Sequence, residues 1–276
     1  MKFFVKSNFF WINSLTICFG KIASKFQTSF HKTSIHEKMD TAQAPQASKQ
    51  TLEAPKRTLR RVAIIGTAGR NEDGEKLNLD IFNSMVECAE SILETKWNLK
   101  PEETILKSGG AAWADHVAVR LFLRSFLSRP FAGLHICLPC PWDDSKAQAL
   151  DTGQYDWRTN PGKTMNSLHH KMSEKAGFDS LKELERAKML GATFDCSASG
   201  FHNRNSLVAK SEYLLAFTFG NGQQPKDGGT MDTWKKHRGQ FKIHVPLPIS
   251  QNNSKKRKVS VLDMLTASPT KVQKLI

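Results

Sequence analysis

The sequence predicts an α/β protein with a Rossmann-like parallel sheet covered by helices on both faces, and with a mainly helical insertion. Short apolar runs alternate with longer segments of helical periodicity, as in chains that build a parallel sheet covered by helices. Three glycine-rich turns also lie between an apolar run and a helical pattern, at residues 66–70, 108–110 and 227–230.

The first half of the domain predicts strand, helix, strand, helix and strand. The three strands are expected over 61–65, 104–107 and 134–138, where the apolar runs are too short for helices. The helices are expected over 79–97 and 112–127, where apolar residues recur at spacings of three and four. Ligands of such folds bind at the carboxyl ends of the strands.

The segment 142–200 interrupts this alternation, and we expect it to form a lid over the site. Helices are expected over 165–175 and 181–190, the second beginning at a capping box, Ser180-Leu181-Lys182-Glu183. The alternation then resumes, and the expected order is a helix over 205–210, a strand over 213–219, a helix over 230–238 and a strand over 242–245.

Composition and charge divide the chain into a tail at residues 1–60, a domain at 61–248 and a basic tail at 249–276. The formal net charge is +14, of which residues 1–61 carry +8 and residues 251–276 carry +5. The intervening residues are nearly neutral, which argues against groove binding of nucleic acid by the domain itself. Nucleic acid remains an expected partner only through the tails.

The tails carry conflicting targeting signals. The acid-free start resembles an organelle presequence or a secretory signal, and a third reading is that translation begins at Met39. Its apolar stretch at 9–20 is too short for a membrane-spanning helix, which needs about 20 residues. Near the other end, Lys255-Lys256-Arg257-Lys258 resembles a nuclear-localisation signal for an import receptor, the alternative being a solvated basic tail. We expect a nuclear or cytoplasmic protein, or an organellar one if the presequence is genuine.

Cysteine and histidine patterns predict no metal site. Five scattered cysteines indicate a reducing compartment. The pair Cys137 and Cys140 has C-x-x-C spacing, but it follows an expected strand and no second pair completes a zinc site, so we expect ordinary core cysteines. His169 and His170 are expected as partly buried helix histidines, since no matching carboxylate accompanies them.

The glycine-rich turns predict an anion-binding pocket. Glycine lets the backbone approach a ligand closely, and a following helix offers unpaired N–H groups with a partial positive charge. Asp115 and Asn205 would fix ribose hydroxyls or orient the turns, the alternative for Asp115 being a cap on its own helix. The other ligand-binding candidates are Gly66, Thr67, Gly69, Ser108, Gly109, Gly110, Gly228, Gly229 and Thr230, with Arg70, Arg204 or Lys163 to neutralise phosphate.

Three motifs stand out over about residues 61–247. In chain order they are Ile65-Gly66-Thr67-Ala68-Gly69-Arg70, Ser108-Gly109-Gly110-Ala111-Ala112-Trp113-Ala114-Asp115, and Arg204-Asn205 to Phe217 followed by Gly228-Gly229-Thr230-Met231-Asp232-Thr233. They resemble motifs of the SLOG superfamily, which includes the Lonely Guy phosphoribohydrolases and DNA-processing protein A. The resemblance implies a Rossmann-like fold that binds nucleotides or nucleotide derivatives, and homo-oligomers.

One departure from that pattern bears on catalysis. Lonely Guy enzymes carry P-G-G-x-G-T-x-x-E, whose glutamate assists cleavage of the N-glycosidic bond, and Thr233 stands at its position. A hydroxyl cannot replace that carboxylate, so the candidate catalytic residues are Asp115 and Asp232. We therefore expect a protein that binds a nucleotide or nucleotide derivative, as a sensor or as a hydrolase. The alternative is a nuclear, nucleic-acid-associated or protein-binding scaffold with an inert core.

Overall fold

The expected Rossmann-like α/β class is confirmed. The computed structural model describes residues 58–226 and 228–248. The order of the strands in the main sheet is β6-β3-β2-β1-β7-β8, and every neighbouring pair is parallel. The strand order reverses at β1, so the ends of β1 and β7 form the switch point where such sheets bind ligands. The six strands are β1 (Arg60–Gly66), β2 (Thr104–Ser108), β3 (Gly133–Cys137), β6 (Thr193–Asp195), β7 (Tyr213–Phe219) and β8 (Phe241–Leu247).

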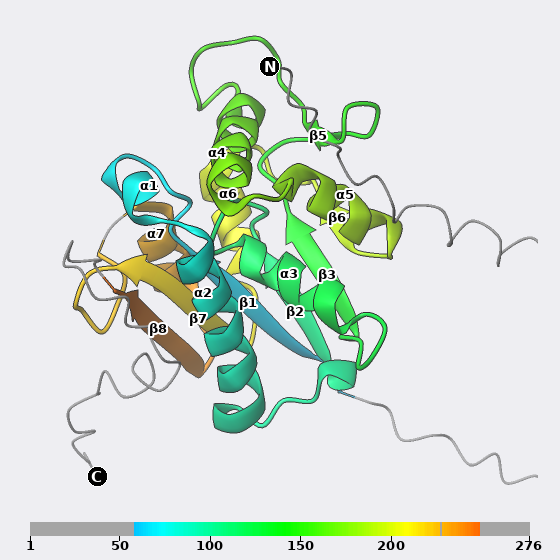
Figure 1. The fold of residues 1–276 in the computed structure, drawn as a ribbon, viewed down its shortest axis with the longest axis vertical. Coiled ribbons are helices and arrows are strands. Elements are labelled where there is room, and N and C mark those ends of the chain that lie inside the picture. Colours follow the sequence, from blue (N-terminus) through cyan, green and yellow to red (C-terminus); the bar gives the residue numbers. More distant parts are fainter. Residues whose placement is uncertain (1–57, 227, 249–276) are drawn as a thin grey trace, which may run out of the picture. The chain divides into compact units, whose positions relative to one another are not determined.

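Helices cover both faces of the sheet (Figure 1). Side chains alternate along β1, so Val62 and Ile64 pack on one side while Ala63 and Ile65 pack on the other. The first side is covered by α2 (Leu79–Ser91), α3 (His116–Ser125), α4 (Pro161–Ala176) and α5 (Ser180–Met189), and the second by α6 (Gly200–Val208) and α7 (Gly228–Lys236). Short elements complete the domain: α1 (Glu72–Lys76), η1 (Ile92–Lys96), η2 (Pro101–Glu103) and the hairpin of β4 (Trp142–Asp143) with β5 (Gln148–Ala149).

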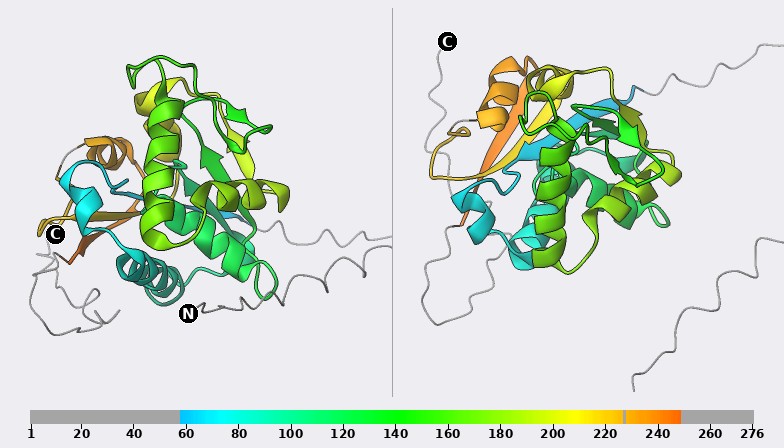
Figure 2. Two further views of the ribbon diagram at one scale, coloured as in Figure 1. Left: turned by 45° about the horizontal axis from the view of Figure 1, so that its top comes forward. Right: turned by 90° about the horizontal axis from the view of Figure 1, so that it is seen from above.

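The segment 142–200 is built into the domain more closely than its sequence indicates. It contains the two expected helices, α4 and α5, but also the β4–β5 hairpin and the edge strand β6. Helix α4 stands over the end of the sheet at which the strands finish (Figures 1 and 2). The segment therefore contributes both an edge of the sheet and a wall above its carboxyl end.

Several helix starts differ from expectation. Helix α4 begins at Pro161 and α6 at Gly200, four and five residues before their expected starts. Helix α3 begins at His116, because the preceding turn holds Gly110 and Trp113 at φ angles of 67° and 61°, outside the helical region. Helix α5 is capped by Asp179, whose carboxylate accepts from the N–H groups of Leu181 and Lys182 at 3.2 and 3.1 Å. The expected capping box at Ser180 is therefore wrong: Ser180 lies inside the helix.

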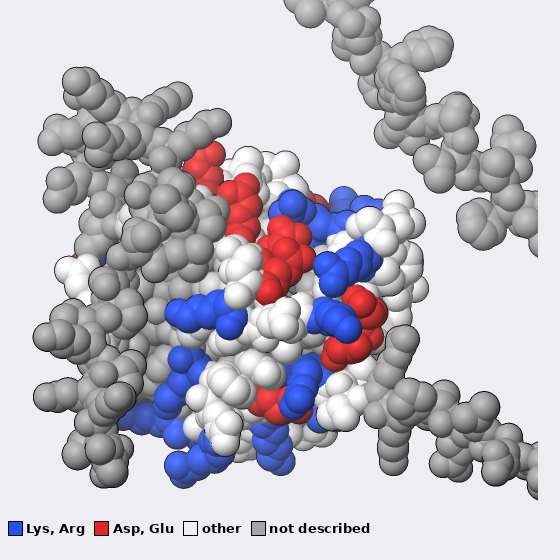
Figure 3. Space-filling view, turned by 90° about the horizontal axis from the view of Figure 1, so that it is seen from below, with Lys and Arg blue, Asp and Glu red and all other residues white. Residues whose placement is uncertain are grey.

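The surface of the domain mixes charges, as its near-neutral balance predicts. Figure 3 shows one face on which lysine and arginine are interspersed with aspartate and glutamate. Among the described residues, no helix is long and apolar enough to cross a membrane. The expectations for the targeting signals and for Lys255-Lys256-Arg257-Lys258 fall in residues 1–57 and 249–276, and Asp227 of the third turn also lies outside the described residues.

Candidate functional site

A cavity of about 740 Å³ opens at the carboxyl end of the sheet. Its size is within the range of small-molecule sites, roughly 300–1,000 Å³. It lies at the switch point, between the turns that follow β1 and β2 and the starts of α6 and α7. The residues that line it include Ile65, Ala68, Arg70, Asn71, Glu72, Asp73, Gly109, Ala111, Ala112, Asp115, Pro139, Trp157, Met165, Leu168, Phe201, His202, Arg204, Asn205, Val208, Gly228, Gly229, Thr230 and Thr233.

A buried ion pair joins the turns beneath the cavity. Nη1 of Arg204 donates to Oδ2 of Asp115 at 3.1 Å and to the carbonyl of Gly109 at 2.8 Å. The other carboxylate oxygen of Asp115 accepts from the N–H of Gly66 at 3.2 Å. Asp115 thus connects the turns after β1 and β2 to helix α6. A residue larger than glycine at position 109 would force a rearrangement, because its Cβ would collide with the Arg204 guanidinium.

Burial dominates the electrostatics of this pair. Burial raises the pKa of the Asp115 carboxyl, while the Arg204 guanidinium and the N–H groups of Ala111, Gly66 and Gly109 oppose the rise. Nε of Arg204 is buried and has no hydrogen-bond partner among the described residues. One donor of this buried cation is therefore unsatisfied, which is unusual for a buried polar group.

A second arginine approaches the same place. The guanidinium carbons of Arg70 and Arg204 lie 5.1 and 5.6 Å from the centre of the Phe201 ring, within cation–π range. Partial burial and the charge of Arg204 lower the pKa of Arg70, which nevertheless stays protonated at neutral pH. Two like charges thus share one wall of the cavity, an arrangement that a bound anion would stabilise.

Helix α7 begins at the cavity. Gly228, Gly229 and Thr230 of its first turn line the cavity, so unpaired N–H groups with a partial positive charge lie at the wall. The Thr230 hydroxyl donates to the carbonyl of Gly66 at 2.9 Å, and Nδ2 of Asn205 donates to the carbonyl of Gly229 at 3.2 Å. These bonds hold the helix start against β1 and α6.

Thr233 and Asp232 have different positions relative to the cavity. Thr233 lines it, is only 2% exposed, and donates its hydroxyl to the carbonyl of Gly229 at 3.0 Å. Asp232 does not line the cavity; it accepts from Lys236 at 2.8 Å and from Asn205 at 3.0 Å. The hydrogen bonds of Asp232 therefore fix Asn205 and the α7 turn.

The structure brings most of the candidate residues to one place. Those that line the cavity are Arg70, Gly109, Asp115, Arg204, Asn205, Gly228, Gly229 and Thr230. Gly66, Thr67, Gly69, Ser108 and Gly110 support the turns instead of lining the cavity.

Several lining residues were not singled out from the sequence. Asn71, Glu72 and Asp73 follow the first glycine turn, so their closeness to Arg70 in the sequence could have indicated their place at the cavity. Trp157 lies within the 142–200 segment and Phe201 just after it, and their rings are 6.0 Å apart. No periodicity predicts that contact, because Trp157 is in irregular chain and Phe201 is at the start of α6.

His169 supports the second glycine turn from α4. It is fully buried: Nε2–H donates to the carbonyl of Gly110 at 3.0 Å, and Nδ1 accepts from the Ser180 hydroxyl at 2.9 Å. Burial, with His116 nearby, lowers the pKa of His169 to about 3, so the ring is neutral at pH 7. His170 is exposed. Both histidines were expected to be partly buried. His169 is therefore more buried than expected, and His170 is less buried.

We expect His169 to make the stability of the domain depend on pH. Its folded pKa lies below the unfolded value of about 6.5, so stability is complete above pH 6.5 and falls as pH drops toward 3. One such group gives a slope of up to about 1.4 kcal/mol per pH unit. Urea unfolding at pH 7 and pH 5 should show a smaller difference for His169→Gln than for the wild type. The exposed neighbour supplies the control His170→Gln, and equal slopes in all three proteins would contradict the assignment.

The two cysteines of the C-x-x-C pair do not share a site. Cys137 belongs to the core cluster on the α6 and α7 side, and Cys140 to the cluster on the opposite side. Burial raises the pKa of each thiol to about 11. The pair is therefore not a reactive dithiol, in agreement with the expectation of core cysteines.

The fold and the cavity define a Rossmann-like α/β protein with a ligand-sized site at its switch point. No family model matches the chain. The uncharacterised protein R261 of Acanthamoeba polyphaga mimivirus is 34% identical over 200 residues, which cover 68% of this chain and 97% of the viral protein. The chain belongs to the same family as this viral protein, and nearly the whole viral protein consists of the shared region.

Proposed function

We propose that the chain binds a nucleotide or nucleotide derivative in the switch-point cavity, as a member of the SLOG superfamily. The observation that carries the proposal is the convergence of Arg70, Arg204 and the first turn of α7 on one wall of that cavity. Charged guanidinium donors and helix N–H groups are the partners that phosphate oxygens prefer. Trp157 and Phe201 supply flat apolar surface of the kind on which a nucleobase stacks.

Position in the fold supports the proposal independently of residue type. Ligands of open α/β sheets bind outside the carboxyl ends of the strands where the strand order reverses, and the cavity has that position. The three motifs that resemble the SLOG superfamily lie around it: the turn after β1, the turn after β2, and the starts of α6 and α7.

The cavity favours binding over N-glycoside hydrolysis. Thr233 faces it without a carboxylate, Asp232 does not line it, and Asp115 is bonded to Arg204. Glu72 lines it but is exposed, so water screens its charge. Asp73 also lines it, but it is partly exposed and accepts from the Thr67 hydroxyl at 2.7 Å. None of these groups offers the desolvated, uncommitted anion that would stabilise positive charge developing on a sugar.

Titration calorimetry tests the proposal on the full chain with adenosine monophosphate, ADP-ribose and adenosine. We expect the two phosphate-bearing compounds to bind and adenosine to bind at least about 10-fold more weakly, since a charge-assisted hydrogen bond contributes roughly 1.5–3 kcal/mol. Arg70→Met should weaken phosphate-bearing ligands by a similar factor. Arg124→Met is the matched control, because Arg124 is exposed and pairs with Glu90 on α2. Equal affinities for adenosine and its monophosphate, or equal losses in both variants, would overturn the proposal.

The same samples report on chemistry. We expect no release of adenine from adenosine monophosphate by chromatography, even where the nucleotide binds. Adenine release that disappears in Glu72→Ala or Asp115→Ala would identify an enzyme with a relocated carboxylate.

A further inference from the structure

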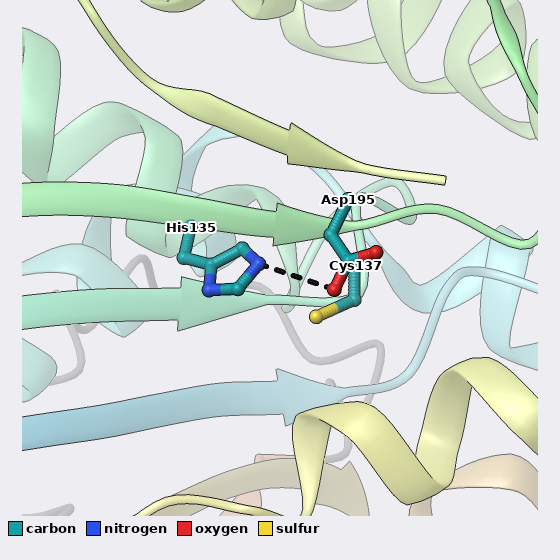
Figure 4. A group of neighbouring side chains, drawn as sticks. All are labelled: His135, Cys137 and Asp195. Carbon is teal, nitrogen blue, oxygen red and sulfur yellow. Dashed lines mark ion pairs between the residues drawn. The ribbon is translucent and has the colours of Figure 1, made fainter. Parts of the chain in front are cut away.

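Three side chains with metal-binding atoms meet at the ends of β3 and β6 (Figure 4). His135 and Cys137 are two residues apart on β3, so they project from the same face of the sheet. Asp195 on β6 is the parallel register partner of Cys137. The nitrogen, sulfur and oxygen atoms that these residues offer all lie within 4.8 Å of one another. The hydrogen-bonded strands therefore position the three groups together.

The donor set has a definite chemical preference. Thiolate, imidazole and carboxylate together suit zinc, which binds them at about 2.0–2.3 Å in tetrahedral geometry. Such bonds place ligand atoms roughly 3.3–3.7 Å apart. Nε2 of His135 and Oδ2 of Asp195 are 3.4 Å apart, so this pair already has a suitable spacing. Sγ of Cys137 lies within 4.8 Å of both atoms and would have to move closer to share one ion with them.

The imidazole nitrogen that faces Asp195 lacks a well-formed hydrogen bond. Nε2 of His135 is buried and makes no hydrogen bond among the described residues, although it lies 3.4 Å from Oδ2 of Asp195, the contact marked by the dashed line in Figure 4. The other oxygen of Asp195 accepts from the N–H and the hydroxyl of Ser197 at 3.0 and 2.6 Å. Ser197 thereby orients the carboxylate and leaves Oδ2 directed at His135. A metal ion would satisfy both atoms.

A lysine close to these three side chains donates its hydrogen bonds elsewhere. Lys107 is the register partner of His135 on β2, and its ammonium donates to the carbonyls of Leu207 and Lys210 at 2.6 and 3.3 Å. With the thiol deprotonated and the histidine neutral, the three ligands carry two negative charges. These charges favour a divalent ion, while Lys107, Arg61 and Arg204, which act on His135 or Cys137, oppose it.

We propose that His135, Cys137 and Asp195 bind one zinc ion, with water as the fourth ligand. None of the three lines the switch-point cavity, so the site is separate from the proposed nucleotide site. His135 and Asp195 are 31% and 25% exposed at their side chains, which leaves a solvent-facing side for the water. A closed structural site would have four protein ligands, whereas three ligands and a water keep an exchangeable position.

Metal binding to the full chain tests the proposal. The protein is dialysed against micromolar Zn²⁺, and bound zinc is measured by plasma mass spectrometry. Affinity should fall at least about 10-fold in His135→Asn and in Asp195→Asn. The matched controls His170→Asn and Asp144→Asn replace exposed residues elsewhere and should bind zinc like the wild type. Absence of zinc from the wild type, or unchanged affinity in both ligand variants, overturns the proposal.

Cobalt distinguishes this site from other histidine and carboxylate groups in the chain. Co²⁺ bound through Cys137 should give a thiolate-to-metal charge-transfer absorption that is lost in Cys137→Ala. His135→Asn provides a second readout should the alanine variant fold poorly, because its side chain is partly exposed. A Co²⁺ spectrum without the thiolate band in the wild type would exclude Cys137 as a ligand and overturn the three-residue site.

Discussion

Asp115→Ala is expected to lower the free energy of unfolding by about 3–5 kcal/mol. The change would leave the Arg204 guanidinium, which is only 9% exposed, without its carboxylate partner. It would also remove the acceptor for the N–H of Gly66. A buried charge without a partner costs far more than the pair contributes, and this asymmetry makes the effect large. Urea unfolding monitored by circular dichroism measures it.

A double variant separates the effect of losing the Asp115–Arg204 ion pair from the effect of losing side-chain packing. Asp115→Ala with Arg204→Met removes both charges and keeps an apolar stem, so it should recover part of the loss. Asp73→Ala is the control, because Asp73 also lines the cavity but is only partly buried and accepts from the Thr67 hydroxyl. A double variant less stable than Asp115→Ala would show that Arg204 stabilises the domain mainly by packing.

Five of the six strands of the main sheet could be predicted, and the clearest are those at its centre. Residues 61–65 and 213–219 are continuous apolar runs, and they form β1 and β7. Strand β6 has only three residues, and Thr193 is exposed, so no apolar run signals it. Helix α1 has no buried residue, and its sequence therefore lacks the apolar face on which helix prediction depends.

Part of the candidate site could be predicted, because its turns contain residue types, glycine above all, that serve few other structural purposes. Glycine turns and the Arg204-Asn205 pair are visible in the sequence, and both lie at the cavity. Whether a turn residue lines a cavity or supports it depends on tertiary packing. The proposed zinc ligands could not be predicted for a similar reason: His135 and Cys137 become a pair only because both project from one face of a strand, and Asp195 joins them only through strand pairing.

Gly229→Leu is expected to weaken nucleotide binding at least about 100-fold, or 2.7 kcal/mol, while changing the free energy of unfolding by no more than about 1 kcal/mol. Gly229 lines the cavity, and a Cβ there would have only Nδ2 of Asn205 as a neighbour, at an ordinary 3.5 Å. The side chain therefore has room in the protein but occupies the place at which phosphate would meet the α7 turn. Calorimetry with adenosine monophosphate and urea unfolding measure the two effects separately.

A substitution at Gly110, in the second glycine turn, should lower the stability of the domain and not its affinity for nucleotide. Gly110 has a φ of 67°, and a Cβ on it would lie 2.6 Å from Leu138 and 2.9 Å from Ile136. Gly110→Ala therefore combines a strained backbone with overpacking, and we expect it to lower the free energy of unfolding by about 2–4 kcal/mol. Because Gly110 packs against the core and does not line the cavity, the folded fraction should still bind nucleotide.

If Gly229→Leu binds nucleotide like the wild type, the α7 turn does not contact the ligand. If Gly110→Ala loses nucleotide binding while it keeps the stability of the wild type, the second glycine turn contacts the ligand.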